Sequence, residues 1–584
     1  MKQWLSPALG LLGCGLIIYG CQTKKDPNPD GSAGSAGTAD TSAGSSSMAG
    51  SDNDGHGGEP GAQAGAAGAA NGGAGNETSA AGAGGETVQG GATGAAGDTS
   101  PGGMPPVVEP PCPAATTVWK EDFEADAPDW GVTGGVWAIG KPTNVAGPTA
   151  FAGMQVAGTG LAADYAANQD AWLTSPEIPV PAAKEHPRFR FKYWYELAAG
   201  DAGYVYVRVK GGNWQLLSTL TQSGDAAWRQ TVYNLESYAD QTVQFGFRLL
   251  SNGASAAPGL FVDEAAFETG SRCFTKNQGF ENDWDNWSTY GGVWAIGKPT
   301  AADGPEPFEG KALAGTILSG DYQANIDSWL VSPIIDVPSA KEEPRVSFKS
   351  WYGLTSGDAG YVYVRADGGN WQLLSTLTDS GDGAWYNTTF PLNAYANRSV
   401  ELGFRLLTNG QTFGPGFYID DFQYQTGAPA LTNPQGFEDG WAGWSVYNGV
   451  WAIGAPTAAA GPTPHSGTAV AGTVLSGDYD PDHDGWLISP RFVVPKDSTN
   501  PSAAYWYWYE LAAGDAGYAY LRVDGGNWQL IDTLTDSGGS VWRQKKIDLT
   551  AYKDHVVELG YRLLTNGAAN TLGYYIDDVT FSLK

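Results

Sequence analysis

Large apolar side chains occupy every second position in short segments along most of the chain. The alternation is clearest in residues 188–195, 204–209 and 242–248, and residues 260–263 begin a further segment. Because successive side chains of a β-strand point to opposite faces of the sheet, a period of two predicts strands with one buried face. No long window carries an apolar stripe of helical period, so the pattern predicts an all-β protein.

Turn residues separate these segments. Gly211-Gly212-Asn213 lies between residues 204–209 and 214–217, and glycine and asparagine tolerate the positive φ angles that tight hairpin turns require. Gly, Pro, Asn and Asp interrupt the other segments in the same way. Short strands joined by such turns favour an antiparallel β-sandwich of the jelly-roll type.

The whole pattern is written three times. Trp137, Trp294 and Trp451 stand in identical Gly-Val-Trp-Ala-Ile-Gly stretches, and each lies 157 residues from the next. This period exceeds the roughly 20–50 residues of solenoid repeats and falls in the usual size range of one self-standing domain. We therefore predict three tandem antiparallel β-sandwich (jelly-roll) domains, over residues 112–274, 275–428 and 429–584.

The N-terminus has the pattern of an export signal. Lys2 is followed by apolar residues 5–18, a run too short and too interrupted to span a bilayer stably. Because the run ends in Ile18-Tyr19-Gly20-Cys21, which resembles the bacterial lipobox, residues 1–20 are expected to be a lipoprotein signal peptide with Cys21 as the lipidated residue. The expected location is the cell envelope, at the outer membrane or cell surface, with the membrane contacted through the lipid anchor. The alternatives are cleavage at a later site, with Cys21 an incidental thiol, and lipidation of Cys14.

Residues 21–111 are expected to form a disordered tether. From Asp26 onward they consist mostly of Gly, Ala, Ser, Thr and Asp, with scarcely a large apolar side chain. Such a segment cannot bury enough apolar surface to offset its chain entropy.

Net charge narrows the choice of partners. The chain carries 32 Lys and Arg against 62 Asp and Glu, a formal net charge of −30. Phosphate recognition requires basic patches, so this balance argues against nucleic acid as a partner. An acidic surplus is typical of a solvated surface and, where carboxylates cluster, of sites for hard cations.

Two cysteines flank the first domain. Cys112 precedes the Phe123-Glu124 pair and Cys273 follows Asp263, each by about ten residues. If the first and last strands of the domain are neighbours, the two thiols could meet, and in an exported protein they would form a disulfide. The other two domains have no such pair, so the bridge would be a local staple.

Several short motifs recur in the same order in the three domains. They are Phe-Glu near the start (Phe123-Glu124), Trp-x-x-Gly-x-Pro (Trp137 to Pro142), Trp-Leu-x-Ser-Pro (Trp172 to Pro176) and a closing Tyr-Ile-Asp-Asp (Tyr418 to Asp421, Tyr575 to Asp578). Their order and spacing resemble the jelly-roll domains of the MAM and cleaved-adhesin type. The resemblance implies a concanavalin-like or galactose-binding-like sandwich, often calcium-bearing, found in secreted adhesins and protease-associated modules. The first domain departs from the pattern by closing on Phe261-Val262-Asp263-Glu264.

Acidic side chains also recur at matched positions, although others were not kept: Glu196 is matched by Gly353. The Phe-Glu motif and the closing acidic pair would meet if the first and last strands are neighbours, and carboxylates held close require a cation or a shared proton. Structural calcium suits them because it is a hard cation that accepts irregular oxygen ligation. The alternative is that these acids cap turns by accepting backbone N–H groups. The candidate calcium ligands are Glu124, Asp201, Asp263, Glu264, Glu281, Asp358, Asp420, Asp421, Glu438, Asp515, Asp577 and Asp578.

Six tryptophans recur in every domain, and most are expected in the core. Trp214, Trp371 and Trp528 differ because each follows a Gly-Gly-Asn turn near a hairpin end, where a partly exposed ring could stack on a sugar. The alternative is that each ring folds back to cover the end of the sheet.

No catalytic pattern accompanies these features. The sequence lacks His-Glu-x-x-His, Cys-x-x-Cys and Gly-x-Ser-x-Gly motifs, and no two histidines occupy equivalent positions in different domains. Three copies on one tether strengthen weak binding through effective concentration. The expected function is therefore that of a cell-surface lipoprotein, not an enzyme, displaying three adhesion or binding modules for glycan or protein ligands. A structural spacer and a carbohydrate-active enzyme are the alternatives.

Overall fold

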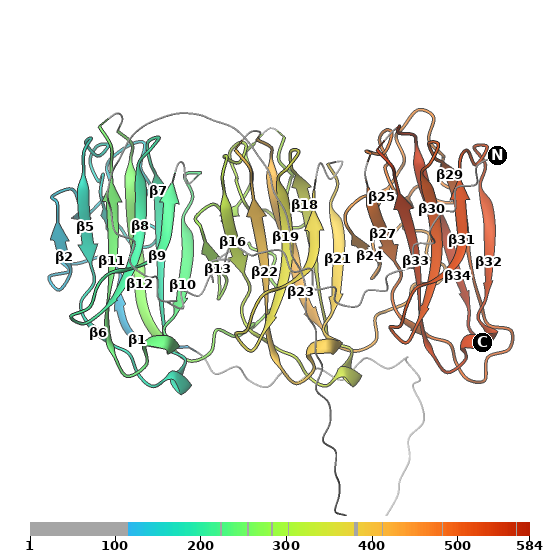
Figure 1. Ribbon diagram of the computed structural model, residues 1–584, viewed down its shortest axis with the longest axis horizontal. Helices are drawn as coiled ribbons and strands as arrows, with labels where there is room; N and C mark the ends of the chain where they lie inside the picture. The colour runs from blue at the N-terminus through green and yellow to red at the C-terminus, as the bar shows by residue number, and fades with distance from the viewer. Residues whose placement is uncertain are drawn as a thin grey trace, which may run out of the picture. The chain divides into compact units, whose positions relative to one another are not determined.

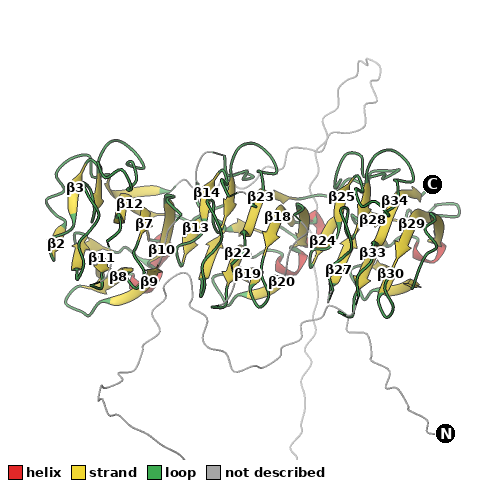
Figure 2. Cartoon of the chain, turned by 90° about the horizontal axis from the view of Figure 1, so that it is seen from above, coloured by secondary structure: helices red, strands yellow, loops and turns green. Residues whose placement is uncertain are grey.

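The computed structural model describes residues 115–584 apart from 222–224, 254–255, 282–283, 302, 379–382, 411–412, 482 and 568. Within this part of the chain the predicted all-β class is confirmed, because strands build three sandwich domains of two facing sheets each (Figures 1 and 2). None of the helices in these residues has the length and apolarity needed to cross a membrane. The expected signal peptide, the tether, Cys21 and Cys112 lie outside the described residues.

The first domain pairs a sheet of order β10-β7-β12-β4-β3, to which β1 adds beside β12, with a sheet of order β2-β5-β11-β8-β9, to which β6 adds beside β11. Its strands are β1 (Thr116–Glu121), β2 (Gly131–Thr133), β3 (Ala138–Gly140), β4 (Val156–Gly158), β5 (Asp170–Thr174), β6 (Ile178–Pro179), β7 (Arg188–Glu196), β8 (Ala202–Val209), β9 (Gln215–Thr221), β10 (Arg229–Asn234), β11 (Thr242–Leu250) and β12 (Gly259–Thr269), with 3₁₀ turns at Ala183–Glu185 and Glu236–Tyr238.

The second and third domains repeat this topology without a counterpart of β1. In the second, the sheets β14-β15-β23-β18-β21 and β13-β16-β22-β19-β20, with β17 beside β22, comprise β13 (Ser288–Tyr290), β14 (Ala295–Gly297), β15 (Leu313–Gly315), β16 (Asp327–Val331), β17 (Ile335–Asp336), β18 (Arg345–Gly353), β19 (Ala359–Ala366), β20 (Gln372–Leu377), β21 (Tyr386–Pro391), β22 (Ser399–Leu407) and β23 (Gly416–Gln425), with 3₁₀ turns at Ala340–Glu342 and Asn393–Tyr395.

In the third domain, the sheets β25-β26-β34-β29-β32 and β24-β27-β33-β30-β31, with β28 beside β33, comprise β24 (Ser445–Tyr447), β25 (Ala452–Gly454), β26 (Val470–Gly472), β27 (Asp484–Ile488), β28 (Phe492–Val493), β29 (Ser502–Glu510), β30 (Ala516–Val523), β31 (Gln529–Thr535), β32 (Arg543–Asp548), β33 (Val556–Leu564) and β34 (Gly573–Ser582), with a 3₁₀ turn at Thr550–Tyr552.

The alternating segments form the strands that their pattern predicts, namely β7, β8, β11 and β12. The expected hairpin is present as the antiparallel pair of β8 and β9, and Gly211 in its turn has a φ of +75°. The inward-facing residues of the two sheets meet in an aromatic core, where the Phe189 and Phe245 rings stack at 3.9 Å. Buried ring area of this kind is the main stabilising contribution available to a sandwich.

The first and last strands of the first domain are neighbours, as expected. β1 pairs antiparallel with β12, with Trp119 opposite Phe267. In the other two domains the same adjacency is reduced to single bridges, from Gln278 to Phe422 and from Gln435 to Val579. The Phe-Glu motif directly follows this position, so each domain brings its motif beside the acidic pair of its last strand.

Candidate functional site

In each domain one loop lies over the carboxylates of the Phe-Glu motif and of the last strand. In the first domain an Oε atom of Glu124 accepts the backbone N–H groups of Met154 and Gln155, both at 2.8 Å. Asp263 Oδ2 accepts those of Phe151 and Ala152 at 3.0 and 3.2 Å. The two acids that the sequence groups together therefore hold the same loop, residues 151–155.

The other two domains repeat this geometry. Glu281 and Asp420 bind the loop at residues 308–312, and Glu438 and Asp577 bind the loop at residues 465–469. A glycine lies in the loop each time because a Cβ at Gly153, Gly310 or Gly467 would come within about 2.2 Å of the glutamate carboxylate. This glycine recurs at the 157-residue spacing, so the sequence carries a signal for the loop as well as for the acids that hold it.

The aspartate at this position is fully buried. Burial raises the pKa of Asp263, Asp420 and Asp577 to about 6 in each domain, although three backbone N–H donors to each carboxyl act in the opposite direction. A carboxylate that is ionised here at neutral pH is therefore poorly compensated by its surroundings.

The acid after each buried aspartate has a positive φ and contacts a different nitrogen-bearing side chain in each domain. Glu264 lies 2.9 Å from Lys120 Nζ, Asp421 lies 3.5 Å from Lys349 Nζ, and Asp578 lies 2.6 Å from His465 Nδ1. Burial holds the pKa of Lys349 below its usual value, while the hydrogen bond to Glu264 raises that of Lys120.

The Asp201 group binds different loops. Asp201 accepts the Tyr165 hydroxyl at 2.6 Å and the Asn252 backbone N–H at 2.7 Å, and it is almost completely buried. Asp358 and Asp515 make the same two bonds in their domains. These contacts give the Asp201 group a loop-fixing role apart from the Glu124 and Asp263 loop.

Calcium stays a prediction. Within the described residues no group of three or more His, Cys, Asp or Glu side chains is arranged to hold a metal ion. The N–H donors to Glu124 and Asp263 match the turn-capping alternative, whereas the poorly compensated buried aspartate would favour a nearby cation.

A second feature is an aromatic surface on the outer side of the β2-β5-β11-β8-β9 sheet. The Trp172 ring lies 5.0 Å from Tyr206 and 5.4 Å from Trp214. The Arg248 guanidinium lies over Trp172 at 5.3 Å and binds both carboxylate oxygens of Asp170, which holds the pKa of Asp170 below its usual value.

Leu216 extends this surface, because it pairs across the strands with Tyr206 and 54% of it is exposed. Seven polar and aromatic positions and this leucine are the same in all three domains. We call this surface the aromatic face: Asp170, Trp172, Tyr204, Tyr206, Arg208, Trp214, Leu216 and Arg248, then Asp327, Trp329, Tyr361, Tyr363, Arg365, Trp371, Leu373 and Arg405, then Asp484, Trp486, Tyr518, Tyr520, Arg522, Trp528, Leu530 and Arg562.

Trp214 itself is half-buried. Its ring packs beneath the Arg208 guanidinium at 4.4 Å and covers Gly246, where an added Cβ would lie 3.0 Å from the indole. Trp371 and Trp528 have the same environment. The ring therefore covers the sheet, which was the alternative to an exposed ring in the sequence analysis. It is also one of the residues of the aromatic face.

A smaller aromatic cluster projects from the carboxylate-held loop and differs between domains. Phe151 is 38% exposed, lies 6.0 Å from Trp228 and has Lys192 Nζ over its ring at 4.4 Å. The second domain keeps this arrangement, whereas the third places His465 on Trp506 at 3.8 Å.

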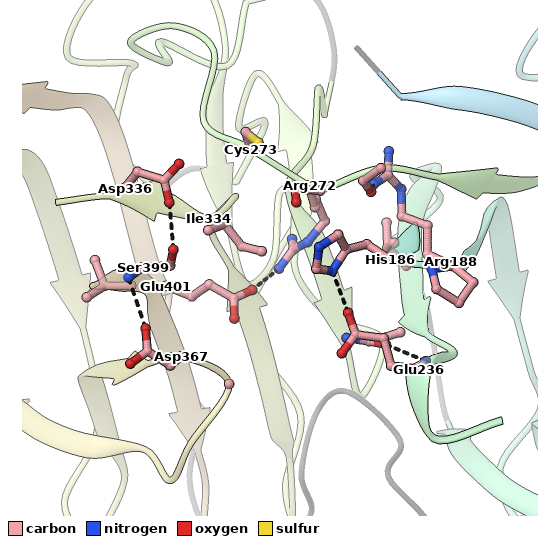
Figure 3. A pocket seen from close by; sticks show the side chains of 17 residues that line it. His186, Arg188, Glu236, Arg272, Cys273, Ile334, Asp336, Asp367, Ser399 and Glu401 are labelled. Carbon is pink, nitrogen blue, oxygen red and sulfur yellow. Dashed lines mark hydrogen bonds and ion pairs between the residues drawn. The ribbon is translucent and has the colours of Figure 1, made fainter. Parts of the chain in front are cut away.

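A pocket of about 410 Å³ lies where the chain passes from the first domain to the second (Figure 3). Its charged side chains engage one another, as Arg272 does with Glu401 and His186 does with Glu236 at 2.7 Å. Cys273 in its wall is disulfide-bonded, and the predicted partner, Cys112, lies outside the described residues. The next junction has Pro429 and Ala430 in place of Arg272 and Cys273, so this pocket is not a repeated feature.

No protein-family model matches the chain. Among curated proteins, bacillopeptidase F of Bacillus subtilis (strain 168) is 29% identical over 227 residues, which are 38% of this chain and 15% of that relative. The chain thus corresponds to a small part of the relative's length.

Several solved structures are similar to parts of the chain. TmCBM61 in complex with beta-1,4-galactotriose is 14% identical and is matched over 100% of its length and 26% of this chain, with a TM-score of 0.21. The K2 cleaved adhesin domain of Lys-gingipain is 19% identical over 97% of its length and 26% of this chain, with a TM-score of 0.19. The CBM22-1-CBM22-2 tandem domain of Paenibacillus barcinonensis Xyn10C is 16% identical over 97% of its length and 53% of this chain, with a TM-score of 0.19.

Proposed function

We propose that the protein presents three glycan-binding modules and that each binds through its aromatic face. The observation that carries the proposal is the identity of this face in all three domains, from the Asp170 and Arg248 pair to the exposed Leu216. Sugars present apolar C–H faces that pack on aromatic rings and hydroxyl groups that bond to charged side chains, and the aromatic face offers both. The fold does not require tryptophan and tyrosine on the solvent side of a sheet whose inner side is already filled by phenylalanine.

Three modules on one chain suit a ligand that is weakly bound at each site. When a second site is engaged on the same chain, its binding is governed by effective concentration, so the array gains avidity without any new contact. Anchoring through Cys21 would place the array at the cell surface, and calcium at the Glu124 and Asp263 loop would stabilise each module; both are parts of this proposal. A protein ligand on the same faces is the second candidate, supported by the exposed leucines.

A glycan array probed with the full chain tests the proposal. Leu216→Asp, Leu373→Asp and Leu530→Asp together place charges on exposed positions of the aromatic faces, so we expect them to abolish the signal without unfolding the domains. Phe151→Ala with Phe308→Ala is the matched control on the neighbouring loop and should keep the signal.

If only the loop variant loses the glycan signal, the glycan binds at the loop and not at the aromatic face. Silence of the unaltered chain on all glycans would overturn glycan binding, and capture by a purified surface protein would then favour the second candidate.

A further inference from the structure

The two junctions between domains are built from the same hydrogen bonds. At the first, the Tyr195 hydroxyl donates to Gly292 O at 2.8 Å and the Thr231 hydroxyl donates to Thr289 O at 2.7 Å. Val232 N–H donates to Ser288 Oγ at 2.9 Å, and the Tyr290 hydroxyl donates back to Val232 O at 2.6 Å.

The second junction has a counterpart of each of these bonds 157 residues further on. Tyr352 donates to Gly449 O at 2.8 Å, Thr388 donates to Val446 O at 3.3 Å, Thr389 N–H donates to Ser445 Oγ at 2.8 Å and Tyr447 donates to Thr389 O. The side chain at the remaining position also bonds the next domain both times, from Gln230 to Trp287 O and from Asn387 to Trp444 O. One surface thus joins an edge strand, β10 or β21, to the first strand of the following domain, β13 or β24.

The corresponding strands at the two ends of the array lack these residues. On β32 of the third domain, Lys545 stands where the junctions have Thr231 and Thr388, and Lys546 stands where they have Val232 and Thr389. On β2 of the first domain, Gly131 and Thr133 stand where the junctions have Ser288 and Tyr290. Residues 229–233 of β10 and all of β13 are buried, whereas β2 is exposed throughout and β32 is largely accessible.

The substitution on β32 is supported by a further change on the adjoining sheet. Lys545 Nζ pairs with Asp532 at 2.8 Å, and Asp532 replaces the serine found at the equivalent position of both other domains, Ser218 and Ser375. Other contributors to the junction are kept in the third domain, since Tyr509 and Gln544 correspond to Tyr195 and Gln230. The changes therefore place a lysine where a neighbouring domain, if it docked on β32, would bury the charge.

We propose that β32 and β2 are blocked forms of one head-to-tail interaction surface, whose natural partner would be the opposite end of a second copy of this chain. A head-to-tail surface that does not close on itself generates open filaments, so an unblocked array would polymerise. The lysines on β32 and the missing serine and tyrosine on β2 would each prevent a further copy of the domain from docking in the manner of the two junctions. Both internal copies of the surface hold neighbouring domains together.

Restoring the surface tests this proposal in the full chain. The variant combines Lys545→Thr and Lys546→Thr with Gly131→Ser and Thr133→Tyr, together with Thr174→Val, because a Cβ at Gly131 would lie 2.5 Å from Thr174 Oγ1 and the second domain has valine there. We expect its weight-average mass in light scattering to rise with concentration to at least twice that of the single chain. The unaltered chain should show no such rise. Lys496→Thr with Lys553→Thr removes the same charge away from β32 and should behave like the unaltered chain.

The reverse change provides a second and independent measurement. Thr388→Lys with Thr389→Lys copies the block into the second junction, so cleavage of the segment between β23 and β24 by a protease should accelerate severalfold while the melting of the domains is kept. A restored variant that folds but stays monomeric would overturn the proposal. Unchanged cleavage in the reverse variant would overturn it as well, because the junction bonds would then not hold the domains together.

Discussion

The buried aspartate of the last strand makes a quantitative prediction about stability and pH. Its folded-state pKa is about 6 in all three domains, compared with 3.8 for the unperturbed side chain. Between these values this carboxyl binds a proton in the folded protein but not in the unfolded chain, so its contribution to stability falls as the pH rises toward 6 and then levels off. At about 1.4 kcal/mol per pKa unit, ionising each buried carboxyl removes up to about 3 kcal/mol from its domain.

Thermal unfolding of the full chain in chelator, from pH 4.5 to 7.5, measures this loss. A change of about 3 kcal/mol corresponds to roughly 6–12 °C in the melting temperature of a domain of this size. In the variant Asp263→Asn, Asp420→Asn and Asp577→Asn, the group no longer ionises, so its share of the pH dependence should disappear. The variant should start lower at acid pH, because the amide has one accepting oxygen in place of the two carboxyl oxygens that together receive three backbone N–H groups.

Calcium is expected to raise the melting temperature that ionisation of the buried aspartate lowers. If the cation binds the ionised carboxylate, millimolar calcium should restore the melting temperature lost above pH 6, with roughly 3–4 kcal/mol available at 100 to 1,000 times the Kd. Glu438→Gln should weaken this rescue in the third domain, whereas Asp497→Asn, an exposed acid outside the shared set, should keep it.

Two results would refute the reasoning. A dependence of the melting temperature on pH that is the same in the wild type and in the triple Asn variant, both in chelator, would show that burial does not raise the pKa of these carboxyls. If calcium does not restore the melting temperature that is lost as the pH rises, the acids act as turn caps and do not bind calcium.

Three further predictions concern other parts of the chain. Gly246→Val should displace Trp214 and Trp172, whose rings lie within about 3.1 Å of an added Cβ, and should lower both the near-ultraviolet circular dichroism of the first domain and its glycan signal; an unchanged spectrum would contradict the packing described. Non-reducing mass spectrometry should find Cys112 joined to Cys273, and loss of the bridge should cost the first domain at most about 5 kcal/mol; a free thiol at Cys112 would exclude this pairing. Cys21→Ala should abolish fatty-acid incorporation and release the protein from membranes, and absence of label in the unaltered protein would exclude the lipid anchor.

The sequence predicted the fold in detail because the physics of a half-buried strand is local. Alternation in residues 188–195 and 242–248 marks strands, and the Gly-Gly-Asn turn marks a hairpin, without any knowledge of what packs against them. The predicted disulfide and carboxylate cluster both assume that the first and last strands are neighbours, and in the first domain β1 does pair with β12.

The candidate sites were less accessible to the same reasoning. A period of two shows that residues 204 and 206 share a face, but it does not show which face meets solvent when both carry large side chains. The sequence therefore singles out Trp214 by its turn, whereas Trp172 is one of the recurring tryptophans of which most are expected in the core, and the recurrence of Arg248 does not by itself place it beside them. The recurrence of Asp201 likewise did not distinguish an acid that meets another acid from one that meets the Tyr165 hydroxyl.

Equivalent positions of the three domains can be compared to distinguish residues that are alike because the domain was duplicated from residues that are kept because of a contact. Recent duplication alone would preserve all positions of the three domains alike, yet Glu196 became glycine in the second domain and the junction residues changed at both outer ends. Against this divergence, the eight residues of the aromatic face are identical in the three domains. Some of them are buried, as Trp329 and Arg365 are, but the leucine is more than half exposed in every domain. The threonine at the position of Thr231 and Thr388 occurs only where a neighbouring domain packs on it, which indicates that this contact maintains it, whereas Tyr509 and Gln544 are also present on the third domain. By the same logic, the unchanged aromatic face indicates a contact made by all three domains, and nothing in the described parts of the chain packs on Leu216, Leu373 or Leu530 to supply it, since each remains more than half exposed.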